Sequence, residues 1–288
     1  MKKYPIKKAG KDFNFTQEIN NKGSREKRMA IDNKGNKAMF KYKMPGRICS
    51  ESCSEKMSYE IARVLGYKCA KIELAYDEEN ELGILNYIFV DTAEEEHIDA
   101  VDYIKKNNEE REEFYTIENI KKCLDRLDFK LFEQFLKIIL FDALVGEQDR
   151  HEENWGVIRK DGGYKLSPLY DNGCNLLKEF YDYNYAQKYY EGKKDFEAYI
   201  ERSVAVIRNN KGKKYKHFEL VKEMYKRYPN QMKKEIINLK KLTNNEISKI
   251  VNKIPNELMQ EKQKEFIIKY VEIRKSRLLN IVEEESEG

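Results

Sequence analysis

Residues 146–173 read GEQDRHEENWGVIRKDGGYKLSPLYDNG, an ordered set of polar side chains in a chain of 288 residues. Asp149 and Asn154 lie five residues apart in a polar stretch that directly follows a strongly apolar segment. Asp171 comes after a predicted hairpin, residues 156–169, whose two halves are separated by a Gly-rich turn. Because a hairpin folds back on itself, we expect it to bring Asp171 close to Asn154. The stretch therefore predicts two carboxylates and one amide in a small volume.

Such a set is what phosphoryl transfer from ATP requires. One carboxylate orients or deprotonates the acceptor hydroxyl, a second holds magnesium, and an amide oxygen can complete the metal shell. Magnesium prefers hard oxygen ligands and usually keeps several waters, so a sparse Asp/Asn set suits it. Each short piece alone is better explained as a helix cap or an Asx-type turn. Their joint occurrence, in this order, favours one candidate base and two candidate metal ligands.

The same residues resemble a known family. Residues 149–154, DRHEEN, and 166–171, LSPLYD, look like the catalytic loop and the metal loop of the HipA-like serine/threonine kinases. The D-R-H-x-x-N form is also similar to that of the phosphoinositide kinases, distant relatives by fold. The resemblance implies that Asp149 is the catalytic aspartate and that Asn154 and Asp171 bind Mg²⁺. We interpret His151 as a structural support of the loop.

The remaining chain divides into a strand-rich part and a helix-rich part. Strands are predicted at 11–19, 28–32, 37–42, 69–76 and 83–90, with a loop at 44–54 and one helix, Glu55–Leu65, between them. After an acidic stretch at 94–113, expected to be an exposed helix or linker, helices are predicted at 129–145, 218–228, 245–253 and 265–282. We therefore predict an α+β, bilobal, protein-kinase-like fold. A small β-rich nucleotide-binding lobe would span residues 1–91, and a larger α-helical catalytic lobe would span residues 92–288.

A kinase also needs a strand lysine for the ATP phosphates and a helix acid that holds this lysine. Lys41 is a single charge inside the apolar strand 37–42 and is the candidate for the first role. An edge-strand lysine with its head in solvent is the alternative. Glu55, at the start of the predicted helix, is the first candidate for the acid, and Glu60 is the second.

A loop that covers the phosphates is expected between the first two strands, and residues 21–27, NKGSREK, are the candidate. The backbone of Gly23 and Ser24, together with Lys27, could contact phosphate oxygens. Ser24 would then be a hypothetical autophosphorylation site. The adenine is expected at the chain crossing near Phe89 and Val90.

Composition excludes several other classes of protein. Hydrophobic residues make up 40%, aromatic residues 12% and charged residues 37% of the chain, which is enough apolar material for a core. A net charge of +4 does not indicate a nucleic-acid partner. Five scattered Cys predict neither a disulfide framework nor a zinc site. With no signal peptide or membrane-spanning run, we expect a cytoplasmic protein.

Three functions remain open. The first is a Ser/Thr protein kinase, and the second is a small-molecule or lipid kinase with the same centre. The third is a non-catalytic pseudokinase or toxin-associated interaction module, which the complete set of Lys41, Asp149, Asn154 and Asp171 disfavours. Full-length HipA toxins carry a further N-terminal subdomain, whereas this chain begins almost directly at the expected nucleotide lobe. We therefore leave an antitoxin-type regulator unsupported.

Overall fold

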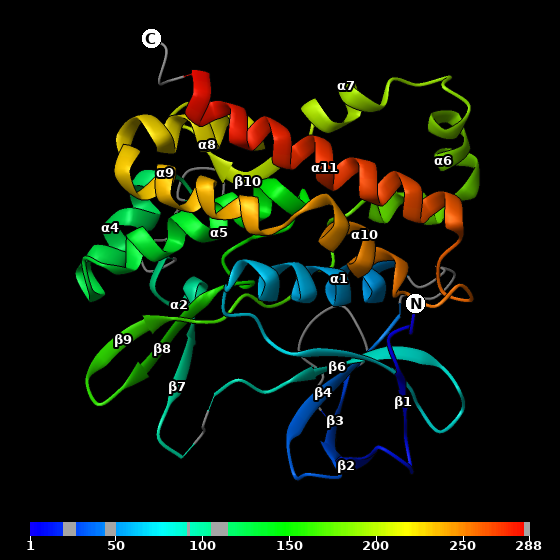
Figure 1. The fold of residues 1–288 in the computed structure, drawn as a ribbon. Coiled ribbons are helices and arrows are strands. Elements are labelled where there is room, and N and C mark those ends of the chain that lie inside the picture. The colour runs from blue at the N-terminus through cyan, green and yellow to red at the C-terminus, as the bar shows by residue number, and fades with distance from the viewer. Residues whose placement is uncertain (20–26, 44–49, 91–92, 105–114, 285–288) are drawn as a thin grey trace.

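A computed structural model describes residues 1–19, 27–43, 50–90, 93–104 and 115–284. In these residues a curled sheet forms the N-terminal part and helices form most of the C-terminal part (Figure 1). The predicted α+β fold, with a smaller β-rich and a larger α-helical lobe, is thus confirmed. The predicted boundary between residues 91 and 92 falls outside the described residues and stays a prediction.

The N-terminal sheet has six strands in the order β1-β5-β6-β4-β3-β2. They are β1 (Ile6–Lys8), β2 (Phe13–Ile19), β3 (Lys27–Asp32), β4 (Lys37–Tyr42), β5 (Ile72–Tyr76) and β6 (Leu82–Tyr87). Strand β1 pairs with β5 in parallel, and all other neighbours are antiparallel. The sequence analysis missed β1, because a three-residue strand with two lysines carries no hydrophobic alternation and depends on pairing with β5.

Both faces of this sheet are packed, which determines where Lys41 lies. Phe40 belongs to a small core on one face, with Phe13 and Leu85. Ile84, the residue before Leu85, belongs to the main core instead. Since successive strand residues point to opposite faces, Lys41 lies on the face opposite Phe40, toward the main core.

Helix α1 (Ser50–Leu65) crosses the molecule between the sheet and the helical part (Figure 1). It begins before Glu55, so the predicted loop up to Ser54 is wrong for residues 50–54. The physical reason is that Cys53, Met57 and Ile61 recur every four residues and are all buried in the main core, which extends the helical stripe by one turn.

A second sheet has the order β7-β8-β9 and is entirely antiparallel. The hairpin β8 (Gly156–Lys160) and β9 (Gly163–Leu166) confirms the predicted one. For residues 96–104, strand β7 (Glu96–Asp99) and the short helix α2 (Ala100–Ile104) instead correct the exposed helix or linker expected at 94–113, and residues 105–113 lie outside the described ranges. The acidic composition of β7 gives no strand signal, because the strand forms through backbone pairing with β8, which is distant in sequence.

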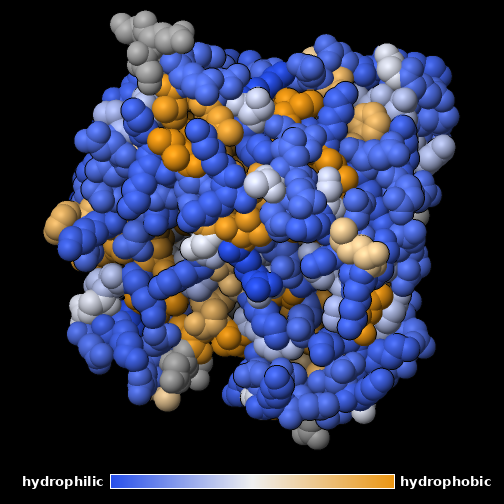
Figure 2. Space-filling view, viewed as in Figure 1, coloured by the Kyte–Doolittle hydropathy of each residue, from blue (hydrophilic) through white to orange (hydrophobic). Residues whose placement is uncertain are grey.

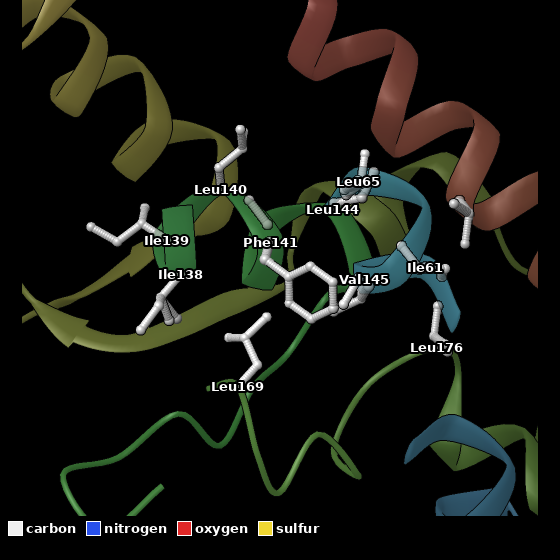
Figure 3. Packing of buried hydrophobic residues seen from close by; sticks show 14 of the residues in the cluster. Ile61, Leu65, Ile138, Ile139, Leu140, Phe141, Leu144, Val145, Leu169 and Leu176 are labelled. Atoms are coloured by element: carbon white, nitrogen blue, oxygen red, sulfur yellow. The ribbon is translucent and has the colours of Figure 1, made fainter. Parts of the chain in front are cut away.

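Helix α5 (Leu131–Val145) is the centre of the helical part. It is buried nearly all round, and its residues from Ile138 to Val145 pack against Ile61 and Leu65 of α1 and against Leu169 and Leu176 (Figure 3). The surrounding elements are α4 (Ile117–Leu127), η1 (Lys178–Tyr181), α6 (Tyr183–Tyr190), α7 (Phe196–Glu201), β10 (Val204–Arg208), β11 (Lys214–Lys216), α8 (His217–Arg227), α9 (Pro229–Asn238), η2 (Leu239–Lys241), α10 (Asn244–Asn252) and α11 (Glu261–Glu284). No helix in the described ranges is long and apolar enough to cross a membrane.

Candidate active site

Helix α5 ends at Gly146, and the predicted catalytic loop starts there. Gly146 has φ +72° and its N–H donates to Asp142 O, as expected for a glycine that terminates a helix. A Cβ at this position would lie 1.9 Å from the Tyr270 hydroxyl oxygen. The close approach of α11 therefore requires glycine at the point where the chain turns into residues 147–154.

Asp149, His151 and Asn154 form one hydrogen-bonded loop. Asn154 Nδ2 donates to Asp149 O at 2.7 Å and lies 3.2 Å from His151 Nε2. These two contacts turn the amide so that Oδ1 faces away from Asp149 O and is available as an oxygen ligand. The Asp149 side chain is 52% exposed. His151 therefore contacts the loop's own amide, in the position expected for a structural support.

Lys41 joins the two lobes. Its Nζ lies 3.1 Å from Asp171 Oδ1 and 3.7 Å from Glu55 Oε2, and Lys41 and Glu55 are both buried. Glu60, the second candidate for the lysine partner, instead pairs with Lys56 and Arg63 on the other side of α1. The lysine is thus buried between two acids, which differs from the alternative of an edge-strand lysine in solvent.

Arg150 holds the two loops together, a role that the sequence analysis missed. Its guanidinium is 3% exposed and pairs with Asp142 of α5, with Nη2 at 3.0 Å from Oδ1. Nη1 donates to Asn154 O at 2.9 Å and to Tyr170 O at 2.7 Å, and Nη2 also donates to Asn172 Oδ1. One side chain therefore ties the loop of Asp149 to the residues on both sides of Asp171. A charged residue inside the D-R-H stretch was the available signal.

Buried acids surround this arginine, and their protonation depends on it. Burial raises the pKa of Asp142, and Arg150 opposes the rise. Burial also raises the pKa of Glu147 to about 8, against the opposing effect of Arg150. Glu147 Oε1 accepts from the Asp149 N–H at 2.9 Å, and Oε2 accepts from Asn175 Nδ2 at 3.1 Å. Glu147 is thus a second link between the two loops.

A cavity of about 310 Å³ lies between the two sheets, and Figure 2 shows the surface hollowed there. Lys27, Lys41, Phe89, Val90 and Asp171 are all among its lining residues. Asp149 and Asn154 belong to the adjoining loop, and Glu55 lies behind Lys41. The predictions for Gly23 and Ser24 concern residues outside the described ranges.

One wall of this cavity is aromatic; Phe89 was expected near the adenine, but its partners Tyr170 and His97 were not. Phe89 stacks on Tyr170 with ring centroids 5.6 Å apart, and His97 meets both rings edge-on. The Tyr170 hydroxyl donates to Asp99 Oδ1 at 3.0 Å. Phe89 follows β6, Tyr170 precedes Asp171, and His97 and Asp99 belong to β7, so the wall is complete only when β7 forms. A flat apolar surface of this kind is suited to a nucleotide base.

A second cavity, of about 240 Å³, lies behind Leu169, against α5 and β9. None of the residues predicted for the site line this second cavity. We therefore place the candidate site at the first cavity, which Lys41 and Asp171 line. The tyrosine-rich segment 181–190 also has a structural explanation. Tyr185, Tyr189 and Tyr190 pack with Phe180 in an aromatic cluster against α11.

Two solved structures have a similar architecture. The Helicobacter pylori proinflammatory kinase CtkA superposes with a TM-score of 0.79 at 21% identity, covering 96% of each chain. HipA of the Shewanella oneidensis toxin–antitoxin system HipA, HipB and operator DNA complex gives a TM-score of 0.54 at 14% identity, covering 98% of this chain and 65% of that one. These likenesses show the fold. Among curated protein sequences, none matches the chain.

The family assignment rests on the sequence itself. The model of the HipA-like C-terminal domain matches residues 19–258. This range includes β4 with Lys41, helix α1 and both loops joined by Arg150. The chain therefore belongs to the HipA-like C-terminal domain family and has the kinase-like fold that residues 149–154 and 166–171 predicted.

Proposed function

We propose that this protein is an ATP- and Mg²⁺-dependent phosphotransferase that passes the γ-phosphate to a Ser or Thr hydroxyl of a protein. The observation that supports this most strongly is the buried Lys41 between Glu55 and Asp171, at the edge of a cavity large enough for part of a nucleotide. A buried lysine with two acids is costly for stability alone, and phosphate binding gives a reason for it.

The donor set of the two loops suits magnesium. Asp171 contributes a carboxylate that is 33% exposed, and Asn154 contributes an amide oxygen. Two protein oxygens, with water and phosphate oxygens for the remaining positions, match the coordination that Mg²⁺ prefers. When bound, the ion would neutralise charge on the phosphate oxygens.

The remaining roles belong to the chain itself. Lys41 would bind the α- and β-phosphates, with Glu55 holding its ammonium in place. Phe89 and Tyr170 would contact the adenine. Asp149 would orient the acceptor hydroxyl and accept its proton, and Glu147 and Asn154 hold the backbone of Asp149 for this task.

The exposure of Asp149 supports a protein acceptor. Its carboxylate is half-exposed rather than enclosed, so the hydroxyl of a large molecule can reach it from solvent. A small-molecule kinase would be expected to enclose its acceptor more completely. No observation favours lipid, an antitoxin-type regulator or a non-catalytic role.

The test is incubation with ATP labelled at the γ-phosphate, with Mg²⁺ or with EDTA, in the presence of generic proteins or a panel of small-molecule alcohols. We expect Mg²⁺-dependent label on Ser or Thr of a protein, identified by acid hydrolysis. Label found only on small molecules would establish the second function instead. Intact-mass analysis of the wild type and of Ser24→Ala would show whether Ser24 accepts phosphate from its own chain.

A further inference from the structure

The candidate catalytic loop contains one arginine, but its side chain points into the protein rather than toward the reacting phosphate. Phosphoryl transfer spreads negative charge over three oxygens, and kinases place a positive side chain against it. Arg150, the one cation in residues 149–154, is turned inward and bound to Asp142 and three loop oxygens. Lys41 is occupied at the nucleotide side. A side-chain cation on the acceptor side would therefore come from another segment.

Lys178 comes to this position from the segment after Asp171. Its Nζ donates to Cys174 Sγ at 2.9 Å, and Cys174 Sγ lies 3.5 Å from Asp149 Oδ2. The three side chains form a line from ammonium through thiol to carboxylate. Lys178 is half-buried, and in the described part of the chain no carboxylate oxygen lies within 4 Å of its Nζ.

The backbone is bent to produce this arrangement. Leu176 and Leu177 both have positive φ, 48° and 60°, in the left-handed region that leucine rarely adopts. Both side chains are buried, and Leu176 N–H donates to Val145 O, so core packing holds the strained turn. The turn directs the start of η1, and with it Lys178, back toward the catalytic loop.

The charges in this line stay separate. Burial and the nearby Glu147 raise the pKa of the Cys174 thiol to about 12, so the sulfur is neutral and can donate to Asp149 while accepting from Lys178. Burial alone would lower the pKa of Lys178, but the thiol, Glu179 and Glu147 hold it above its usual value. The neutral thiol therefore holds the positively charged Lys178 ammonium near Asp149 and adds no negative charge that would offset it.

We propose that the Lys178 ammonium contacts the phosphoryl group in transit, on the acceptor side of the site, and so acts as a further catalytic residue of the proposed reaction. In that step the bond from the γ-phosphorus to the bridging oxygen breaks, and the ADP oxygen keeps the electron pair. A bond forms from phosphorus to the acceptor oxygen, whose proton passes to Asp149. Lys178 balances charge on the three equatorial oxygens and is unchanged at the end.

The test is a comparison of Lys178→Met, Lys178→Arg and Lys193→Met in γ-phosphate transfer from ATP. Lys193 is an exposed lysine whose ammonium pairs with Glu191, so it serves as the matched control. We expect Lys178→Met to lower kcat about 100-fold with little change in KM for ATP, since removal of one such donor has this order of effect. Lys178→Arg should recover part of the loss, and Lys193→Met should behave as the wild type.

Aluminium fluoride bound with ADP mimics the phosphoryl group in transit. Its binding is a second measurement, which would not change selectively if Lys178 had only a structural role. Lys178→Met should weaken this complex but leave ADP alone bound as in the wild type. A Lys178→Met variant with unchanged kcat, or with equal losses for ADP and its fluoride complex, would overturn the inference while the proposed function stands. A wild type that transfers no phosphate to any acceptor would overturn both.

Discussion

Lys41 Nζ lies 3.1 Å from Asp171 Oδ1, although 130 residues separate them in the sequence. The contact joins strand β4 of the first sheet to the loop that follows the second. Asp171 has φ +52°, a left-handed conformation that is uncommon for any residue with a side chain. Arg150, bound to the preceding carbonyl of Tyr170, holds this conformation. A strained residue fixed from both sides is expected where function needs its side chain in one direction.

If Asp171 is a magnesium ligand, its replacement should weaken ATP binding only when the metal is present. We expect Asp171→Asn to reduce ATP affinity about tenfold or more in Mg²⁺, because an amide is a weaker magnesium ligand than a carboxylate. In EDTA the loss should be much smaller. Titration calorimetry under both conditions measures the difference. Equal losses in the two conditions would show that Asp171 acts on the fold or on Lys41 rather than on a metal.

Arg150 should be one of the most sensitive positions for stability. Arg150→Met leaves the Asp142 carboxylate buried without its cation and removes the bonds to both loops, which should cost about 3–5 kcal/mol. Denaturant unfolding measures this loss. Adding Asp142→Leu should restore part of it, because the unpaired buried charge is then gone. A double variant no more stable than Arg150→Met would contradict a buried ion pair as the cause.

Glu147 should make stability depend on pH. Its pKa is raised by burial to about 8 in the folded protein, above the ordinary value of 4.5. The folded state therefore binds the proton more tightly, so this stabilisation is complete below pH 4.5 and is lost as pH rises through 8. The slope is at most about 1.4 kcal/mol per pH unit. Glu147→Gln should flatten the unfolding free energy between pH 5 and pH 8 relative to the wild type, and an unchanged slope would exclude Glu147 as its source.

The parts of the fold with strong local signals were predictable. Helix α5 has apolar residues on nearly all sides, and the β8–β9 hairpin has a Gly-rich turn between two short apolar runs. Elements that form only by pairing with a strand distant in the sequence were not predictable. Strand β7 is acidic and pairs with β8, and β1 has three residues and pairs with β5.

For the site, residue types were easier to predict than orientations. Lys41 stood out as a single charge inside an apolar strand and Asp171 as a carboxylate that follows the predicted hairpin, and the structure brings the two side chains together. The choice of Glu55 over Glu60 depends on which side of α1 faces the sheet, and the sequence analysis missed the extra turn of α1 before Glu55. The sequence analysis gave Arg150 no role, because only the buried position of Asp142 explains the inward orientation of the arginine.

The most direct test of the account is single-turnover transfer of the γ-phosphate by Asp149→Asn, compared with Asp161→Asn. Asp161 is an exposed aspartate in the β8–β9 turn, with a positive φ that asparagine also tolerates. The account predicts that Asp149→Asn slows transfer about 10²-fold to 10⁴-fold while ATP affinity stays near that of the wild type. Asp161→Asn should transfer at the wild-type rate. Transfer by Asp149→Asn as fast as by Asp161→Asn would contradict the assignment of the phosphoryl-transfer centre to this loop.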